Sequence, residues 1–419
     1  MKQYKIEDIR NIGLVGHGGS GKTSVAEAML YISGVNDRLG KVGDASSVMD
    51  YDPDEVKRGS SVSASVAFYE SDKNKVNLID APGDSNFIAD MPACLRVVDG
   101  AVIVVSAVDG IQFYTEKAWK WSTEQSIPKI IFINKLDQEG ADVPAVLESI
   151  RKKFQVTPFC IHLPVGAGES FSGVVDLLTK KSYSYDPGGS GNGKSGDVSG
   201  EVKDAMDSTL AELTESVAEV DDALTENYLE NGGLSEEEFN AGLKTGIKEG
   251  KLLPVLLGSA TQNIGIDFLM QAILDYLPSP DQRAPVIGKN PKDDSEVACA
   301  ADLGSPLAAL VFKTVADPYA GKLTLFRVFS GALKGDSSVY NATQETSERV
   351  GQLFLSQGKK QVPVPEISAG DIGAVAKFKV TTTSDSLSEN SKPVQFDPID
   401  FPSPVLSKAL APKTRADEE

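Results

Sequence analysis

A glycine-rich octapeptide near the start of the chain constrains its fold more than any other feature. Residues 16–23, Gly-His-Gly-Gly-Ser-Gly-Lys-Thr, match the phosphate-loop pattern G-x-x-x-x-G-K-[ST] at every fixed position. A short apolar run at 12–15 precedes the loop, and a helix-compatible run at 24–32 follows it. This context disfavours the alternative of an ordinary glycine turn. It predicts an α/β sheet that binds phosphate at the carboxyl end of its first strand.

The residues of this loop have separate predicted roles in holding a nucleotide. Successive backbone N–H groups form a nest for an anion. Lys22 would reach the β- and γ-phosphates, and the hydroxyl of Thr23 would bind Mg²⁺. The predicted nucleotide-binding residues of the loop are Gly18, Gly19, Ser20, Gly21, Lys22, Thr23 and Ser24.

Two later segments complete a phosphate and magnesium site. An apolar run at 76–79 leads into Asp80-Ala-Pro-Gly83. An acid at the end of a buried strand is suited to Mg²⁺, and the N–H of Gly83 can face the γ-phosphate. Residues 36–65, which lie between these two elements, are rich in Gly, Asp and Ser. They are predicted to be the first switch, although a plain surface loop fits their composition equally well.

The segment Asn134-Lys135-Leu-Asp137 follows another apolar run and predicts which base is bound. The carboxylate of Asp137 can accept hydrogen bonds from both N1–H and the exocyclic amine of guanine, whereas adenine would leave it unpaired. Asn134 would bridge the purine to the phosphate loop, and the Lys135 stem would cover the ring. Backbone N–H groups of Ser259 and Ala260 suit the guanine O6. The predicted cofactors are therefore GTP or GDP and Mg²⁺.

With these elements in this order, the chain resembles a translational GTPase, and specifically elongation factor G, over nearly all of its 419 residues. Residues 317–331 and 369–375 resemble the family's second domain, and residues 404–417 resemble the first strand and turn of its third domain. The resemblance implies a ribosome-associated GTPase of the cytoplasm. It also implies catalytic roles for Lys22, Gly83 and the residue after it, and magnesium ligands at Thr23, Ser61 and Asp80.

Three positions depart from the family's usual residues. Gly19 stands where the family carries an Asp that supports a monovalent cation. Ser61 stands at the position of a magnesium-binding Thr. Asp84, the predicted third catalytic residue, replaces the His that orients the attacking water, and its charge would repel the phosphate oxygens. These changes suggest a divergent second copy of elongation factor G.

Domain boundaries follow from composition along the chain. We expect a GTPase domain over 1–283, with a mainly parallel sheet and an α+β insertion at about 157–254. Short alternating runs predict an antiparallel β-barrel over 284–400. Residues 401–419 would form the first strand of an incomplete third domain, so that the chain would be truncated. Within the insertion, 187–196 is predicted to be a flexible loop, and 202–229 and 234–249 are predicted to be helical.

Charge and cysteine content limit the choice of partners. A net charge of −19 disfavours broad contact with phosphate backbones, so no sequence-specific nucleic-acid binding is predicted. The three cysteines give no disulfide framework. The apolar stretch at 97–108 is too short to span a membrane. The expected state is a monomer whose partner, by resemblance, is the ribosome.

The sequence thus favours GTP hydrolysis in translation, in translocation or in ribosome recycling. One alternative is a slow or non-hydrolysing GTP/GDP switch that acts as a regulatory binding protein, suggested by Gly19, Ser61 and Asp84. Another alternative is a ribosomal protection or release-factor GTPase that shares the same N-terminal half.

Overall fold

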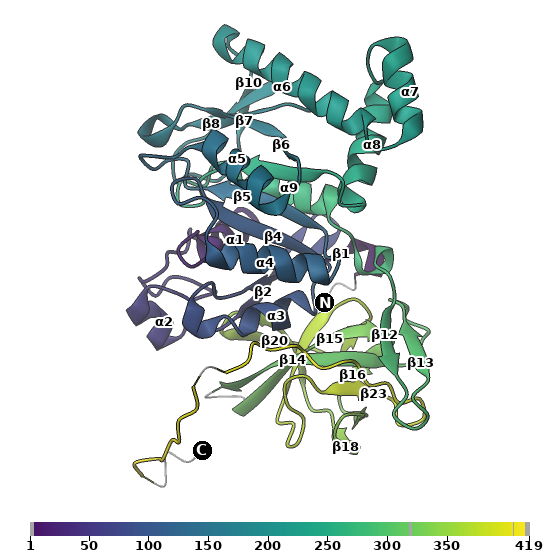
Figure 1. Ribbon diagram of the computed structural model, residues 1–419. Coiled ribbons are helices and arrows are strands. Elements are labelled where there is room, and N and C mark those ends of the chain that lie inside the picture. The colour runs from purple at the N-terminus through teal and green to yellow at the C-terminus, as the bar shows by residue number, and fades with distance from the viewer. Residues whose placement is uncertain (1–3, 318–320, 405, 415–419) are drawn as a thin grey trace.

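The computed structural model describes residues 4–317, 321–404 and 406–414. An α/β unit carries an insert at one end (residues 162–251), and an antiparallel β unit lies against its other end (Figure 1). The β unit begins at residue 286 and follows the α/β unit in the chain. Among the helices described, none combines the length and the apolar character needed to cross a bilayer.

The central sheet of the α/β unit has seven strands in the order β2-β3-β1-β4-β5-β11-β6. Strand β2 runs antiparallel to β3, and the other neighbouring pairs are parallel. Burial on both faces of a parallel sheet accounts for the uninterrupted apolar runs of β4 and β5. The strands are β1 (Ile9–Val15), β2 (Ser65–Ser71), β3 (Asn74–Asp80), β4 (Gly100–Ser106), β5 (Lys129–Asn134), β6 (Pro158–Cys160) and β11 (Leu253–Leu257).

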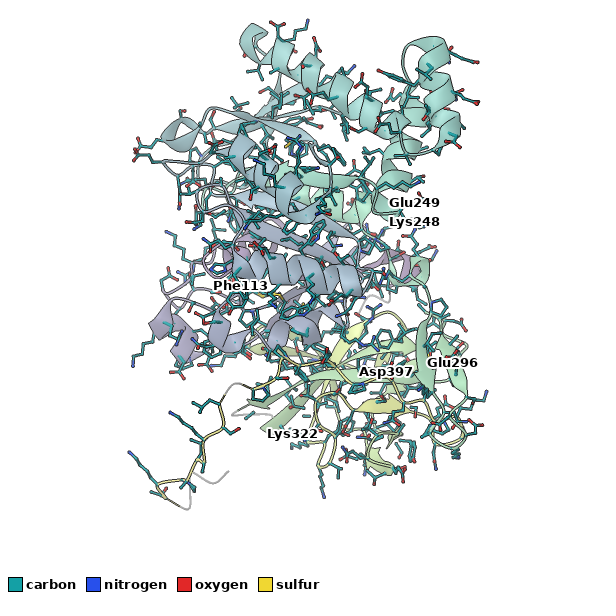
Figure 2. All side chains as sticks on the ribbon, in the orientation of Figure 1. Phe113, Lys248, Glu249, Glu296, Lys322 and Asp397 are labelled. Atoms are coloured by element: carbon teal, nitrogen blue, oxygen red, sulfur yellow. The ribbon has the colours of Figure 1, made fainter. Side chains whose placement is uncertain are left out.

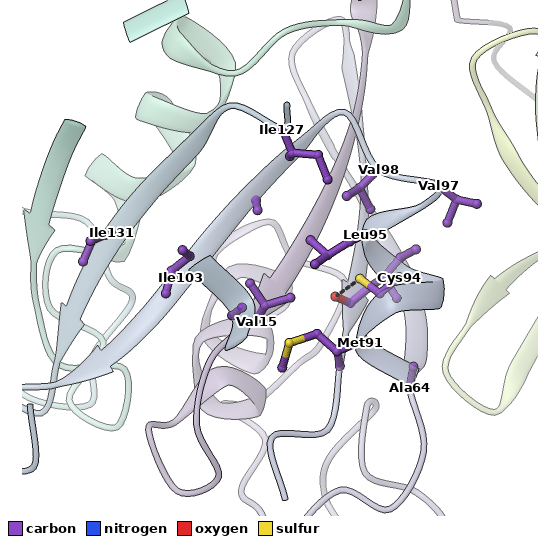
Figure 3. Close-up of a cluster of buried hydrophobic side chains, with 14 of the residues drawn as sticks. Val15, Ala64, Met91, Cys94, Leu95, Val97, Val98, Ile103, Ile127 and Ile131 are labelled. Atoms are coloured by element: carbon purple, nitrogen blue, oxygen red, sulfur yellow. Dashed lines mark hydrogen bonds between the residues drawn. The ribbon is translucent and has the colours of Figure 1, made fainter. Parts of the chain in front are cut away.

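Helices cover both faces of this sheet. Alternate residues of one strand face opposite layers, so Ile103 of β4 joins one hydrophobic cluster while Val102 joins the other. Figure 3 shows the first cluster, in which Met91 and Cys94 of α3 lie beside Val15 of β1. The helical segments are η1 (Ile6–Asp8), α1 (Lys22–Ile32), α2 (Pro53–Arg58), η2 (Ser85–Phe87), α3 (Asp90–Leu95), α4 (Phe113–Glu124), α5 (Val143–Phe154), α9 (Ile266–Tyr276) and η4 (Pro280–Gln282).

The insert combines an antiparallel sheet of order β10-β9-β8-β7 with three helices. The helical region expected over 202–229 is split in two, because the side chain of Asp221 accepts a hydrogen bond from Leu224 N at 2.9 Å and starts a new helix. The insert contains β7 (His162–Val165), η3 (Gly168–Ser170), β8 (Gly173–Asp176), β9 (Lys181–Ser184), β10 (Lys194–Gly196), α6 (Gly200–Ala218), α7 (Asp222–Asn231) and α8 (Glu236–Lys248).

The loop expected to be flexible over 187–196 is held at several points. Gly188 N donates to Gln262 O at 2.8 Å, and Asn263 Nδ2 donates to Gly189 O at 3.0 Å. The end of the loop pairs with β9 as strand β10. Glycine-rich composition gave no sign of these contacts, since they are made largely by main-chain groups.

The β unit is antiparallel, with eight strands in the order β18-β17-β23-β14-β15-β22-β19-β20 and two further pairs, β12-β13 and β16-β21. The expected fold class, a mainly parallel α/β domain with an insertion followed by an antiparallel β domain, is therefore confirmed. The strands are β12 (Val286–Lys289), β13 (Glu296–Cys299), β14 (Ala308–Asp317), β15 (Gly321–Ser330), β16 (Ala332–Lys334), β17 (Ser338–Asn341), β18 (Thr346–Arg349), β19 (Leu353–Gln357), β20 (Lys360–Val364), β21 (Glu366–Ser368), β22 (Ile372–Ala376) and β23 (Ser386–Ser388).

The segment after the β unit differs from expectation. Residues 401–404 and 406–414 are exposed and include no strand, although 401–419 was expected to form one. Figure 1 shows this tail running away from the body of the molecule. A single strand needs a neighbour to satisfy its backbone groups and to bury one face, and the described tail has none. The remaining positions of the predicted strand lie outside the described residues.

Buried ion pairs join the β unit to the α/β unit. Lys75 of β3 is fully buried and pairs with Asp371 at 2.8 Å. Arg327 of β15 pairs with Asp99 at 2.7 Å, and Asn11 of β1 donates to the same carboxylate at 2.8 Å. Because each charge has a partner from the other unit, the junction is satisfied only when the two units are together.

Two further contacts connect the β unit to the segment before β2. Lys313 of β14 pairs with Asp90 of α3 at 2.7 Å and also donates to the hydroxyl of Ser63. The β19–β20 turn lies on β2, where Gly358 N donates to Val66 O at 2.9 Å. A Cβ added at Gly358 would lie 2.0 Å from Val48 O, so the two backbones are in close contact.

Candidate guanine-nucleotide site

The predicted phosphate loop connects β1 to α1 at the carboxyl edge of the sheet. Gly21 precedes α1 with a left-handed φ of 93°, and a Cβ there would lie 2.3 Å from Asn134 Nδ2. Glycine is therefore required at this position both by conformation and by space. The loop turns sharply enough to place Lys22 as the first residue of α1, facing the cavity beside it.

Lys22 is the main positive group of this cavity. Its side chain is buried, and Nζ donates to His17 O at 2.9 Å. Burial lowers the pKa of Lys22, while the carboxylates of Asp80 and Asp50 oppose that shift. An ammonium that donates to one carbonyl in a partly desolvated position is suited to pair with a negatively charged phosphate.

Two hydroxyls and a carboxylate meet next to Lys22. Thr23 Oγ1 donates to Asp80 Oδ2 at 2.6 Å and lies 3.1 Å from Ser61 Oγ. Neighbouring ligands of an octahedral Mg²⁺ are about 3 Å apart, so the two hydroxyls have a suitable separation. Asp80 Oδ1 is buried without a hydrogen-bond partner among the described residues. These residues fit a magnesium ion that takes its other ligands from phosphate and water.

The environment of Asp80 shows what a cation would change. Burial raises the pKa of Asp80 to about 7, with the charge of Asp50 adding to the rise. The ammonium of Lys22 and the hydrogen bond from Thr23 act in the opposite direction. A divalent cation near this carboxylate would favour its charged form.

Gly83 is wedged against the phosphate loop. Gly18 N donates to Gly83 O at 2.8 Å. A Cβ added at Gly83 would lie 2.3 Å from Gly16 O and 2.5 Å from Lys22 Nζ. Any side chain at this position would displace Lys22 or the loop, so the site needs glycine here for close approach.

Asp84 lines the cavity, but its carboxylate is engaged elsewhere. Oδ1 accepts a hydrogen bond from Asn86 N at 2.9 Å and so caps η2. Oδ2 lies 3.9 Å from Arg58 Nη2 of α2. Arg58 thereby offsets part of the negative charge that the sequence placed beside the phosphate oxygens.

Asn134 connects the phosphate loop to the turn after β11. Its Nδ2 donates to Ser20 O at 2.9 Å, and its Oδ1 accepts from Ala260 N at 2.9 Å. Ser259 N donates to Ile264 O at 3.0 Å. Both amides predicted to face the guanine O6 are therefore already paired within the protein. This differs from the sequence expectation, because the 259–264 bridge and Asn134 satisfy these N–H groups first.

Asp137, the residue predicted to recognise the base, has an unpaired acceptor. Asp137 is half-buried, and its Oδ1 is shielded from solvent without a partner among the described residues. Lys135 lines the cavity with a left-handed φ of 69°. A buried carboxylate oxygen with no donor is costly unless a ligand supplies one, and guanine offers two.

The structure brings most of the predicted residues to one cavity of about 470 Å³. The residues that line it are Gly18, Gly19, Gly21, Lys22, Thr23, Ser24, Ser61, Gly83, Asp84 and Lys135. The residues that lie outside this lining are Ser20, Asp80, Asn134, Asp137, Ser259 and Ala260. Asp80 contacts the lining residue Thr23, and Asn134 contacts Ser20, which lies between the lining residues Gly19 and Gly21.

Asp50 is a cavity residue that sequence reasoning missed. It lines the cavity, is 2% exposed, and has a buried Oδ2 without a partner among the described residues. Glu27 of α1 fixes its position by accepting hydrogen bonds from Val48 N at 2.7 Å and Met49 N at 2.9 Å. The sequence shows an acidic residue between Met49 and Tyr51, but no neighbouring motif distinguishes it from the other acidic residues of the segment.

His17 of the phosphate loop also lines the cavity. The imidazole is stacked on Tyr114 of α4 with ring centroids 5.5 Å apart, and Nδ1 accepts from Tyr114 N at 3.4 Å. The neighbouring Phe113, labelled in Figure 2, is 59% exposed at the start of the same helix. His17 thus contributes to the wall that faces α4.

Comparison with known proteins agrees with this geometry. Residues 7–279 match the elongation factor Tu GTP binding domain, and residues 306–390 match elongation factor G domain 2. A crystal structure of a protein from Thermus thermophilus is similar with a TM-score of 0.84 and 31% sequence identity. The alignment covers 98% of this chain and 59% of that protein, so the chain spans less than two thirds of its relative's length. The chain therefore belongs to the translational GTPases, with an elongation factor Tu-type GTP-binding domain followed by a second domain of the elongation factor G type.

Proposed function

We propose that this chain binds GTP with Mg²⁺ and hydrolyses it to GDP as part of a ribosome-associated translation factor. The observation that carries the proposal is the meeting of Lys22, Thr23 and Ser61 at one cavity, with Asp80 hydrogen-bonded to Thr23. Membership of the family indicates that the bound nucleotide contains guanine, and the unpaired Oδ1 of Asp137 supports this choice of base.

Each residue has a role in phosphoryl transfer to water. Lys22 and the loop amides would stabilise charge on the β- and γ-phosphates. Thr23 and Ser61 would ligate Mg²⁺ directly, and Asp80 and Asp50 would hold its water ligands. When bound, Mg²⁺ neutralises charge that develops between the phosphates. The N–H of Gly83 would contact the γ-phosphate. Gly18, Ser24 and Lys135 would contact the nucleotide.

A second candidate function is a slow GTP/GDP switch. It is favoured by Asp84, whose carboxylate caps η2 and faces Arg58 and is not free to orient a water molecule. Poor positioning of an attacking water costs about 10²-fold in rate. In this case the bound nucleotide would control a partner, and turnover would be incidental.

The ribosome is the partner that we propose for both functions. An elongation factor G type second domain supports it, and reducing cytoplasm suits the three free cysteines. Translocation and ribosome recycling are both compatible with the two matched domains. A ribosomal protection or release-factor GTPase is the third possibility. From Gly19, Ser61 and Asp84 we infer that the chain comes from a divergent copy of elongation factor G.

The deciding experiment measures single-turnover GTP hydrolysis with and without ribosomes. It compares the unmodified chain with Asp84→His and with Asp84→Asn, which keeps the η2 cap and removes the charge. Stimulation of the unmodified chain by ribosomes supports the hydrolase. Stimulation of Asp84→His alone supports the slow switch. If tight GTP binding is present and ribosomes stimulate none of the three proteins, hydrolysis on the ribosome is contradicted.

A further inference from the structure

A second cavity, of about 460 Å³, lies at the junction of the α/β unit and the β unit. Its walls come from α3, the segment that follows α4, the linker into β12, and strand β15. Three arginines from these different parts of the chain line it: Arg96, Arg283 and Arg327. It is separate from the nucleotide cavity and shares no lining residue with it.

The guanidinium groups of this cavity have few partners. Arg327 is 4% exposed; it donates to Val97 O and to Asp99, but its buried Nε has no partner among the described residues. Arg283 Nη1 donates to Ser126 O at 2.7 Å. The guanidinium of Arg96 has no hydrogen-bond or ion-pair partner among the described residues. Most of the donors of Arg96 and Arg283 are therefore available.

The local charge balance is positive. Asp99 is engaged by Arg327 and Asn11, and Asp397 is the other carboxylate in the lining. Figure 2 labels Asp397 in the upper part of the β unit. Burial lowers the pKa of both Arg96 and Arg283; the charges of Asp397 and Asp99 oppose this at Arg96 and Arg283 respectively, and the charge of Arg327 adds to it at both. In a chain of net charge −19, this concentration of positive charge has only one carboxylate left to balance it.

We propose that this junction cavity is a binding site for a small phosphate-bearing anion, held by the guanidinium groups of Arg96, Arg283 and Arg327. Arginine forks match the oxygens of a phosphate in pairs, so Arg96 and Arg283 can each contribute a fork. Arg327 contributes its unpaired Nε, because its Nη1 and Nη2 already donate to Val97 and Asp99. The cavity has the volume of a small-ligand site. Because Arg327 is 4% exposed, a small anion can reach it, whereas a nucleic-acid backbone is too bulky to do so.

The site also has a structural consequence. Arg96 and Asp99 come from the α/β unit, Arg283 comes from the linker, and Arg327 comes from the β unit. An anion bound by all three would hold the two units together. The linked free energy would appear as resistance of the junction to thermal separation in the presence of phosphate.

Calorimetric titration with inorganic phosphate tests the proposal. The phosphate loop is first filled with a non-hydrolysable GTP analogue and Mg²⁺, and the titration is repeated on Lys22→Ala without nucleotide. Arg96→Gln and Arg283→Gln should each weaken phosphate binding about tenfold. The matched control is Arg349→Gln, an 83% exposed arginine on β18 that should change nothing. Asp397→Asn should tighten binding, because it removes the competing carboxylate.

The outcomes separate the possibilities. Saturable phosphate binding that is weakened by Arg96→Gln and kept in Lys22→Ala supports the site. Absence of saturable phosphate or pyrophosphate binding at millimolar concentration overturns it. Binding of a short RNA that depends on Arg96 in a chain that ignores phosphate also overturns it, and assigns the arginines to a nucleic-acid contact. Equal binding by the arginine variants and the unmodified chain places the anion elsewhere.

Discussion

Asp137 has the environment that most directly predicts a measurable specificity. Its shielded Oδ1 has no donor among the described residues, and the proposed guanine base would supply one. Asp137→Asn should weaken GTP binding about 100-fold and improve binding of xanthosine triphosphate, whose C2 carbonyl accepts from the new amide. Equilibrium titration with both nucleotides measures the change.

The control for this exchange is Asp142→Asn. Asp142 caps α5 nearby by accepting from Ala145 N at 2.9 Å, and asparagine caps a helix equally well. Its substitution should leave both affinities unchanged. Unaltered GTP preference in Asp137→Asn would remove Asp137 from base recognition.

His162 gives a pH dependence of stability with a defined sign. Burial beside Phe268 lowers its pKa to about 4, and the charge of Asp176 only partly opposes this. The unfolded chain binds the proton from about pH 6.5 downward, whereas the folded chain binds it only near pH 4. Folding stability should therefore be fully present above pH 6.5 and be lost as the pH falls toward 4, by about 1.4 kcal/mol per unit.

Chemical denaturation of the unmodified chain and of His162→Gln between pH 7 and pH 4 measures this effect. The difference in unfolding free energy between the two proteins should shrink as the pH falls. A constant difference would show that His162 titrates alike in both states.

At the residue scale, sequence predicted the groups that a motif fixes locally. Lys22 and Thr23 lie at the start of α1, Asp80 ends β3 and Gly83 follows it, so the order of the elements brings these four residues to one edge of the sheet. Asp50 was missed because its position depends on Glu27, which is distant in sequence. The pairing of the Ala260 N–H with Asn134 could not be predicted either, because it is a contact between residues far apart in the chain.

At the scale of elements, Lys313 links strand β14 to helix α3 and to the segment before β2. It pairs with Asp90 and donates to Ser63, two residues from the proposed magnesium ligand Ser61. Lys313→Met should speed amide hydrogen exchange over residues 61–66. It should also weaken Mg²⁺ binding in the nucleotide complex about three- to tenfold, because Ser61 loses its support.

Hydrogen exchange followed by mass spectrometry checks this expectation. The matched control is Lys360→Met, which removes an exposed lysine from β20 of the same unit. Identical exchange of residues 61–66 in Lys313→Met and Lys360→Met would contradict the proposed support.

Strand and helix types were largely predictable from apolar runs, while element ends were not. Strand β4 is buried throughout, and its residues 101–105 are all apolar because both faces of the strand are covered. The break between α6 and α7 follows from one cap, Asp221, within a continuous periodic pattern. Strand β10 forms because β9 offers an edge, and its own sequence of Lys, Ser and Gly contains no strand signal.

At the scale of the whole molecule, a buried charge holds the two units together. Asp371→Ala would leave Lys75, which is fully buried, without its ionic partner. Removing one member of such a pair costs about 3–5 kcal/mol. The double variant Lys75→Met/Asp371→Ala should recover much of this loss, because it leaves no unpaired charge.

Denaturant unfolding of the variants measures the loss. The comparison is Asp336→Ala, which removes a 90% exposed carboxylate that faces Arg349 and should cost less than about 1 kcal/mol. Equal stability of Asp371→Ala and Asp336→Ala would show that the junction does not depend on this pair. Sequence could not reveal the pair, because its members are separated by 296 positions and neither belongs to a motif.

The contact between Gly358 and the segment at Val48 has a consequence for the lifetime of a bound nucleotide. Glu27 holds that segment from one side and the β19–β20 turn touches it from the other, two residues from Asp50. An isolated loop opens within nanoseconds to microseconds, whereas a domain moves over microseconds to milliseconds. The rate of nucleotide release would then be limited by the slower motion of the β unit. NMR relaxation dispersion should give the same exchange rate for Val48 and Gly358. Two different rates would show that the segment at Val48 moves independently of the β19–β20 turn.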